Sequence, residues 1–339
     1  MICSSERALR IGVGKMEKLD TRIVLPQPIR QEGVDYLREN VREVIVAEDA
    51  RLETVLKYMN ADVTGVLLRS WPFGKALFDS APNLKVISRH GNGYDNIDMA
   101  EANRRGVLVV NAPDAATDSV AEHAATLVLM LCRKMYLARG AVASGRHISR
   151  AYEPEDAAGK FVGIIGPGRI GKATAKRLQA FGMHILVYAR HMTGTKAAAL
   201  GFEKCESLSE LLSRADFVLP LTPLTEETRH LLGAKEFAQM KPTAYVVNCS
   251  RGAVLDEQAL IDALRRGVIA GAGLDVAENE PLDVNSPLIT MENVIITPHV
   301  AAITPDSMLR MAMTSARQLV EVLRGGEPWS PVNPQVLNR

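Results

Sequence analysis

The segment that most constrains how this chain folds runs from Lys160 to Leu178 and reads KFVGIIGPGRIGKATAKRL. Its first residues, 161–165, form a short apolar run rich in β-branched side chains, which is typical of a buried strand. A G-x-G-x-x-G pattern follows at once, made by Gly166, Gly168 and Gly171. The residues after it have a helical composition, so the segment predicts a strand, a tight turn and a helix.

Each glycine of this segment has a physical task. Gly166 permits the tight turn out of the strand, Gly168 lets a pyrophosphate approach the backbone, and Gly171 lets helix and strand pack closely. The N–H groups at the helix start, together with the positive end of the helix dipole, would hold the phosphates. The strand–turn–helix context predicts dinucleotide binding, and the alternative is an ordinary turn between a strand and a helix.

Length and charge narrow the class of protein. The 339 residues predict about two domains with ample core. A net charge of +1 gives no electrostatic footprint for nucleic acid or an anionic membrane, and no apolar run approaches the roughly 20 residues of a membrane span. The four cysteines lack metal or disulfide spacing, so we expect no metal site and a cytoplasmic setting: Cys3, Cys132, Cys205 and Cys249.

Short apolar segments alternate with helical ones in both halves of the chain, and this alternation predicts parallel, doubly wound sheets. The expected strands are 22–26, 44–46, 66–68, 85–88 and 107–110 in the first half, and 161–165, 185–188, 217–219, 245–248, 271–275 and 294–297 in the second. Helices are expected at 31–39, 52–59 and 304–323. Residues 1–20 are interpreted as a leader, with Met16 as an alternative start.

A single long helix is expected between the two halves, over residues 118–143. Its middle is apolar on all sides and should be buried, and Asp118 or Ser119 is expected to cap its start. A helix of this length between two α/β blocks suits a domain connector or a subunit interface.

The end of the second predicted strand after the glycines bears on cofactor choice. An acid at this place holds the ribose 2′-hydroxyl of NAD, whereas an arginine suits the 2′-phosphate of NADP. Here the strand ILVYARH ends in Ala189, Arg190 and His191, without a carboxylate. We therefore expect NADP to be favoured, with NAD as the other possibility. The alternative is that Arg190 is an ordinary solvated charge.

Three further strand ends carry polar side chains. VVNCSRG places Arg251 after one strand, GLDVAENEP places Asp275 at the end of the next and Glu280 beyond it, and IITPHVA places His299 after a third. Ligands of open α/β sheets bind beyond the carboxyl ends of the strands, so these loops are expected to converge with the dinucleotide in one crevice.

These residue types suit hydride transfer to or from an alcohol carbon. A histidine exchanges the hydroxyl proton near neutral pH, a carboxylate beside it stabilises the imidazolium, and a guanidinium grips a carboxylate or polarises a carbonyl. Each residue also has a structural alternative. His299 would be a capping or core residue, Glu280 a surface acid, and Arg251 the partner of a nearby acid.

From about Thr21 to Val332 the chain resembles the D-isomer-specific 2-hydroxyacid dehydrogenases. The motifs that carry the resemblance occur in the family's order: HGNGYDNID, GIIGPGRIG, LTEETRHL, VVNCSRGAVLDE, AGLDVAENEPL and TPHVA. The resemblance implies a Rossmann NAD(P)-binding domain, residues 118–303, inserted into a flavodoxin-like substrate domain, residues 21–117 and 304–339. It also implies a homodimer formed through the long helix 118–143, and domain closure over the substrate.

The resemblance also implies roles for particular residues. Arg251 would bind the substrate carboxylate and keto oxygen, His299 would be the general acid/base and Glu280 its partner. Backbone N–H groups of Asn92 and Gly93, with Arg69 close by, would meet the substrate carboxylate. The expected cofactor contacts are Gly166, Gly168, Arg169, Ile170, Gly171, Ala189, Arg190, His191, Thr222, Pro223, Thr228, Cys249, Ser250 and Asp275.

The sequence thus predicts an enzyme that interconverts a small 2-keto acid and its D-2-hydroxy acid, similar to hydroxypyruvate reductases or phosphoglycerate dehydrogenases. Trp71 stands where a second base would favour a phosphorylated substrate, and no regulatory extension is expected after residue 339. His123 is expected to pack, and 147–152 of a partner subunit is expected to line the pocket. The alternative function is a dinucleotide-sensing binding protein of the corepressor type.

Overall fold

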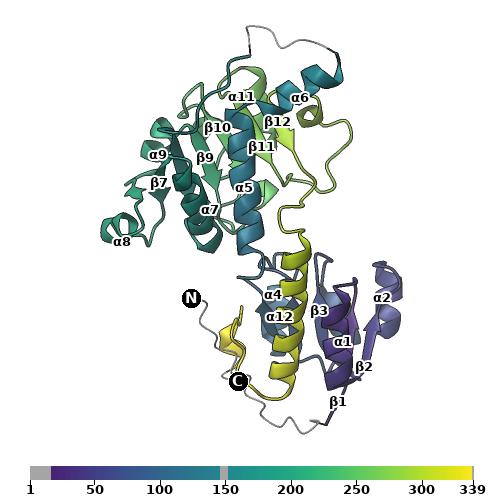
Figure 1. Cartoon of the computed structure of the whole chain (residues 1–339). Coiled ribbons are helices and arrows are strands. Elements are labelled where there is room, and N and C mark those ends of the chain that lie inside the picture. Colours follow the sequence, from purple (N-terminus) through teal and green to yellow (C-terminus); the bar gives the residue numbers. More distant parts are fainter. Residues whose placement is uncertain (1–16, 146–151, 338–339) are drawn as a thin grey trace, which may run out of the picture. The chain divides into compact units, whose positions relative to one another are not determined.

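The computed structural model describes residues 17–145 and 152–337 and divides the chain into two compact units (Figure 1). Unit 1 is drawn from residues 1–115 and 308–339, and unit 2 from residues 116–307. The leader expected over 1–20 lies outside the described residues up to position 16, and so does 147–151 of the expected partner segment.

Unit 1 contains a five-stranded parallel sheet in the order β2-β1-β3-β4-β5. This is the strand order of flavodoxin-like doubly wound folds, as predicted. The strands are β1 (Leu19–Leu25), β2 (Val41–Val46), β3 (Val63–Leu68), β4 (Val86–Arg89) and β5 (Leu108–Asn111). The helices are α1 (Gln31–Asn40), α2 (Leu52–Tyr58), α3 (Lys75–Ser80), α4 (Met99–Arg105) and α12 (Pro305–Leu323), which belongs to unit 1 from Met308 onward.

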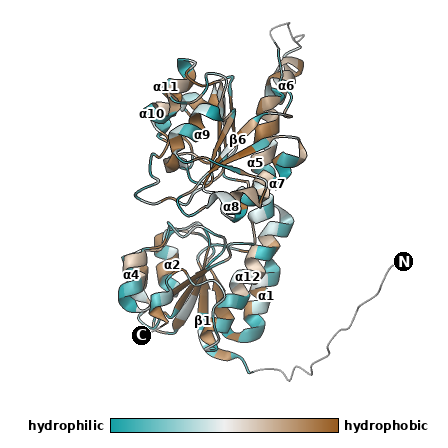
Figure 2. Cartoon of the chain, turned by 90° about the vertical axis from the view of Figure 1, so that its left-hand side faces the viewer, coloured by the Kyte–Doolittle hydropathy of each residue, from teal (hydrophilic) through white to brown (hydrophobic). Residues whose placement is uncertain are grey.

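Successive residues of β3, β4, β5 and the second half of β1 are mostly buried because helices cover both faces of the sheet. Val24, for example, packs in one apolar cluster, whereas its neighbours Ile23 and Leu25 pack in another. The second cluster includes Leu319 from α12. Figure 2 shows the consequence as hydrophobic strands between helices whose outer surfaces are hydrophilic. A strand buried on both faces reads as a continuous apolar run rather than an alternation, which is how these strands appear in the sequence.

Unit 2 contains a seven-stranded parallel sheet in the order β12-β11-β10-β9-β6-β7-β8. The strands are β6 (Phe161–Ile165), β7 (His184–Tyr188), β8 (Glu203–Lys204), β9 (Phe217–Pro220), β10 (Tyr245–Asn248), β11 (Gly271–Leu274) and β12 (Val294–Ile296). The helices after β6 are α7 (Arg169–Ala180), α8 (Gly194–Ala198), α9 (Leu208–Arg214), α10 (Ala234–Phe237) and α11 (Glu257–Arg265). The chain reverses its direction across the sheet between β6 and β9, so the predicted doubly wound Rossmann topology is confirmed.

The prediction of one continuous helix over 118–143 is wrong. The structure has two helices, α5 (Thr117–Cys132) and α6 (Met135–Ala143), with Lys134 between them at a left-handed φ of 46°. The backbone carbonyls that would continue α5 are bonded elsewhere. Glu155 N donates to Cys132 O over 2.9 Å, and Tyr152 Oη donates to Arg133 O over 2.6 Å.

The start of α5 also differs from expectation. Its N-cap is Ala116, which offers no side-chain cap. Asp118 instead accepts a hydrogen bond from Arg177 on α7, and Ser119 bonds to Thr304. The middle of α5 is buried, as predicted. In the described part of the chain, no helix combines the length and the apolarity that a membrane span requires.

Candidate active site

The glycine loop lies between β6 and α7, at the reversal of strand order. Gly166 has a φ of 77°, and a Cβ there would stand 2.6 Å from Thr222 Cγ2. A Cβ on Gly171 would stand 3.2 Å from Ile164 Cγ2, which fits the predicted close packing of helix on strand. A Cβ on Gly168 would stand 4.0 Å from Gly166 O and would meet nothing nearer in the described chain beyond the adjoining residues, so this side of the loop is open to a ligand.

The predicted ribose loop after β7 is connected to the predicted adenosine loop after β9. Arg190 Nη1 donates to Glu227 Oε2 over 2.8 Å, and both side chains are 65% exposed. Such exposed pairs contribute only about 0–1 kcal/mol. Thr228 holds the second loop in shape, because its hydroxyl donates to Pro223 O over 2.6 Å and accepts from Thr225 N over 2.8 Å.

The loop that carries Arg251 is shaped by Asn248, the last residue of β10, which is fully buried. The amide Nδ2 of Asn248 donates to Arg251 O over 2.9 Å, and its Oδ1 accepts from Ser250 N over 2.9 Å. Sequence reasoning did not single out Asn248. The signal was an amide at a strand end immediately before a polar loop, where it can bond the backbone two or three residues later.

Gly252 brings the Arg251 loop against the loop that carries Glu280. A Cβ at Gly252 would stand 1.8 Å from Ala277 O, so no larger residue fits between the two backbones. The Arg251 guanidinium is near enough to Glu280 for its charge to help lower the pKa of that carboxyl. The two loops therefore come together through direct contact between their backbones.

His299 and Glu280 form a pair. His299 Nδ1 and Glu280 Oε2 are 2.7 Å apart, with the two side chains 47% and 39% exposed. Burial of the Glu280 carboxyl opposes its ionisation, but the hydrogen bond and charge of His299, the Ala277 N–H and the charge of Arg251 outweigh it and lower the Glu280 pKa. The carboxylate is thus ionised at neutral pH and faces the imidazole ring.

Asp275 anchors the loop that carries His299. Its side chain is 1% exposed, and its oxygens accept from Thr297 Oγ1 over 2.6 Å and from the N–H groups of Val300 and Ala301 over 2.9 Å. Its carbonyl accepts from His299 N over 2.7 Å. Cys249 lies nearby, and burial, followed by the charge of Asp275, raises the pKa of its thiol, which stays protonated.

Unit 1 carries the other predicted substrate residues at the carboxyl ends of its strands. Arg69 follows β3 and donates to Pro28 O over 3.0 Å, and Asn92 O, after β4, accepts from Asn111 Nδ2 over 2.7 Å. His90, which precedes Asn92, is 4% exposed. Its burial, followed by the charges of Arg69 and Arg89, lowers the pKa of His90 to about 3, so the ring is neutral.

Fold and site together define a dinucleotide-binding α/β protein with a histidine–carboxylate pair and a neighbouring guanidinium. The family model described as "D-isomer specific 2-hydroxyacid dehydrogenase, NAD binding domain" matches residues 125–301. The chain belongs to this family.

Individual relatives agree with this assignment. A glyoxylate reductase from Thermococcus gammatolerans is 39% identical over 93% of this chain and 97% of the relative. A D-3-phosphoglycerate dehydrogenase from Methanocaldococcus jannaschii is 40% identical over 90% of this chain but only 58% of the relative. A crystal structure of an NADPH-dependent glyoxylate/hydroxypyruvate reductase from Sinorhizobium meliloti, in complex with NADP and malonate, is 33% identical, has a TM-score of 0.82, and matches 92% of this chain and 96% of the other. These named enzymes do not favour the corepressor alternative.

The backbone contact at Gly252 yields a stability prediction. Gly252→Ala forces the Arg251 and Glu280 loops apart, and overpacking of this kind costs about 1–3 kcal/mol or more. We expect a lower midpoint of thermal unfolding. Gly194→Ala is the control, because within the described residues no atom lies within 4 Å of a Cβ there. Equal midpoints of thermal unfolding for Gly252→Ala and Gly194→Ala would contradict a close backbone contact at Gly252.

Proposed function

We propose that this chain uses NAD(P) to interconvert a small 2-keto acid and its D-2-hydroxy acid, with Arg251, Glu280 and His299 as the catalytic residues. The observation that carries the proposal is the 2.7 Å contact between His299 Nδ1 and Glu280 Oε2, beside Arg251, on a unit of a 2-hydroxyacid dehydrogenase family member. Both the acid/base group and its charged partner that the reaction needs are thus present.

The proposed mechanism assigns one task to each side chain. The chemistry supplied by the cofactor, when bound, is hydride exchange with the substrate carbon. Arg251 holds the substrate carboxylate and polarises the keto oxygen. In reduction, His299 gives the proton on Nε2, the ring nitrogen that Glu280 does not bond, to that oxygen. The ionised Glu280 orients the ring and stabilises the imidazolium before this transfer.

The glycine loop and its neighbours are the proposed cofactor site. The open side of Gly168 and the twelve-residue helix α7 suit a pyrophosphate. Arg169, Ile170 and Ser250 join the loop in this proposal, as do Thr222, Pro223 and Thr228. The exposed Arg190 and His191 follow β7 where the sequence has no acid, and this supports a preference for NADP over NAD.

The proposed substrates are small keto acids such as glyoxylate and hydroxypyruvate, which the names of the relatives suggest. Arg69 and the backbone of Asn92 and Gly93 in unit 1 are proposed to bind the carboxylate. Trp71 in the loop after Arg69 supports a small, unphosphorylated acid, because a phosphate would need further positive charge there.

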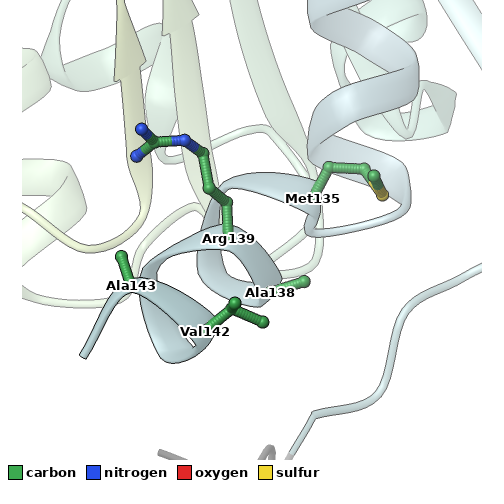
Figure 3. A pocket seen from close by; sticks show the side chains of 5 residues that line it. All are labelled: Met135, Ala138, Arg139, Val142 and Ala143. Carbon is green, nitrogen blue, oxygen red and sulfur yellow. The ribbon is translucent and has the colours of Figure 1, made fainter. Parts of the chain in front are cut away.

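We also propose a homodimer, with α6 in the interface. All residues of α6 are at least partly exposed, and Met135 and Val142 are 54% and 77% exposed. Figure 3 shows them on a shallow hollow that Ala138, Arg139 and Ala143 complete. None of these residues belongs to the Arg251–Glu280–His299 cluster, so the hollow suits a partner surface rather than the substrate.

The acid/base assignment predicts a loss of turnover. His299→Ala is expected to lower the rate of keto-acid reduction about 10²–10⁴-fold, the usual contribution of a positioned acid/base. This rate is measured by steady-state kinetics with glyoxylate, hydroxypyruvate, pyruvate and phenylpyruvate. His184→Ala, at an exposed position at the start of β7, is the control. A wild-type rate in His299→Ala would remove His299 from the mechanism.

The ionised Glu280 carboxylate predicts a second loss of turnover. Its lowered pKa keeps it charged at neutral pH beside the His299 ring, and the proposed proton transfer uses this charge. Glu280→Gln removes the charge and is expected to lower kcat in the same steady-state assay. Glu292→Gln, an exposed acid of the same unit, should keep the wild-type kcat. A wild-type kcat in Glu280→Gln would contradict the proposed charge stabilisation.

The Arg190–Glu227 pair predicts two opposite changes in cofactor use. Arg190→Gln is expected to raise the KM for NADPH about 10-fold or more and to leave that for NADH within about twofold, because it removes a charge-assisted bond to the 2′-phosphate. Glu227→Gln removes the competing carboxylate and should lower the KM for NADPH a few-fold. Glu226→Gln, next to it, is the control. Equal changes for both cofactors would contradict the NADP preference.

The proposed dimer predicts a change in mass. The double variant Met135→Lys/Val142→Lys places charges on the apolar face of α6 and should convert a dimer to a monomer in light scattering after gel filtration. Leu200→Lys, at an apolar residue 42% exposed elsewhere in unit 2, should stay dimeric. A monomeric wild type, or a double variant of unchanged mass, would refute the proposed interface.

A further inference from the structure

Helix α5 contacts both ends of the loop that carries His299. His123 Nε2 lies 3.0 Å from Thr297 Oγ1 at the start of this loop, and Ser119 Oγ lies 3.0 Å from Thr304 Oγ1 at its end. Because residues four apart lie on the same helix face, His123 and Ser119 reach the loop from one side of α5. Sequence reasoning expected His123 only to pack.

The hydrogen bonds around Thr297 fix which ring atom of His123 carries a proton. Both oxygens of Asp275 accept backbone N–H groups, and the single hydroxyl proton of Thr297 goes to Asp275 Oδ1 over 2.6 Å. Only lone pairs of the Thr297 oxygen then remain for His123. The imidazole must therefore donate, so the proton of His123 lies on Nε2.

This arrangement reaches His299 through Asp275. The Asp275 side chain holds the N–H groups of Val300 and Ala301, and the Asp275 carbonyl holds the N–H of His299 itself. His299 has a φ of 54°, a conformation that costs free energy for any residue with a side chain and persists only when its surroundings impose it. The bonds to Asp275 flank this strained residue on both sides.

We propose that His123 is a positioning residue for His299. Its Nε2–H orients the Thr297 hydroxyl, the hydroxyl donates to Asp275, and Asp275 fixes the backbone that aims the His299 ring at the substrate. His123 Nε2 is also 3.5 Å from Asp275 Oδ1, so its N–H dipole lies close to a buried carboxylate. This inference rests on the proposed acid/base function of His299.

The first test compares two replacements of His123. His123→Leu removes the donor and is expected to lower kcat about 10-fold while the KM for NADPH or NADH stays within about twofold, because the glycine loop and the loops after β7 and β9 are untouched. His123→Gln keeps an N–H at the place of Nε2 and is expected to recover most of kcat. Two results would overturn the proposal. One is a kcat for His123→Gln as low as for His123→Leu, and the other is a cofactor KM in His123→Leu that worsens as much as kcat does.

The second test uses Thr297. Thr297→Val removes the hydroxyl and Thr297→Ser keeps it, so Val is expected to lower kcat about 10-fold and Ser to lower it little. The double variant His123→Leu/Thr297→Val is expected to be no worse than either single variant, because both break one chain of bonds. Independent, multiplying losses would overturn the proposal. Thr126→Val is the control, since among the described residues this exposed hydroxyl of α5 donates to Glu122 O and to no other group.

His299→Ala separates failure of this inference from failure of the proposed function. If His299→Ala reduces keto acids at the wild-type rate, the acid/base function fails and the positioning role fails with it. If His299→Ala is inactive while His123→Leu and Thr297→Val match wild type, only the positioning role fails. The midpoint of thermal unfolding is measured for each variant to show that it folds. If His123→Leu does not fold, the comparison of Thr297→Val with Thr297→Ser decides the outcome.

Discussion

The buried carboxylate of Asp275 is the constraint on which the candidate site depends. Removing an ion from water costs several kcal/mol unless hydrogen bonds replace its hydration. Asp275 meets this demand with the hydroxyl of Thr297 and the N–H groups of Val300 and Ala301. The loop between β12 and α12 must therefore fold around it, and His299 is held in that loop at an otherwise unfavourable φ.

Two glycines also constrain the site, because the absence of a side chain lets neighbouring loops approach each other closely. Gly166 allows the loop after β6 to approach Thr222, and Gly252 allows the loop after β10 to touch the backbone at Ala277. One contact brings together two loops of the proposed cofactor site, and the other brings the Arg251 and Glu280 loops together. The Arg251 and Glu280 loops each follow directly on their own strand, so the close approach at Gly252 leaves little freedom in where these two side chains stand.

The charges of unit 2 differ in how strongly the fold constrains them. Arg190 and Glu227 pair in the open, where water screens them and either side chain is free to turn to a ligand. Glu280 and His299 are partly covered and share neighbours with Arg251, so their interaction depends on loop backbone that cannot shift independently. The proposed cofactor preference thus rests on exposed side chains, whereas the proposed proton transfer depends on the packed loops.

The sequence by itself determined the parallel sheets, the glycine loop and the motifs of Arg251, Glu280 and His299, because apolar runs and strand-end residues are local signals. Tertiary structure alone decided the break between α5 and α6, where the bonds from Tyr152 and Glu155 come from about twenty residues further along the chain. It also decided the bond from His123 to Thr297, which joins residues 174 positions apart. Such contacts leave no periodicity in the sequence, since they depend on how separate elements pack around a buried polar group.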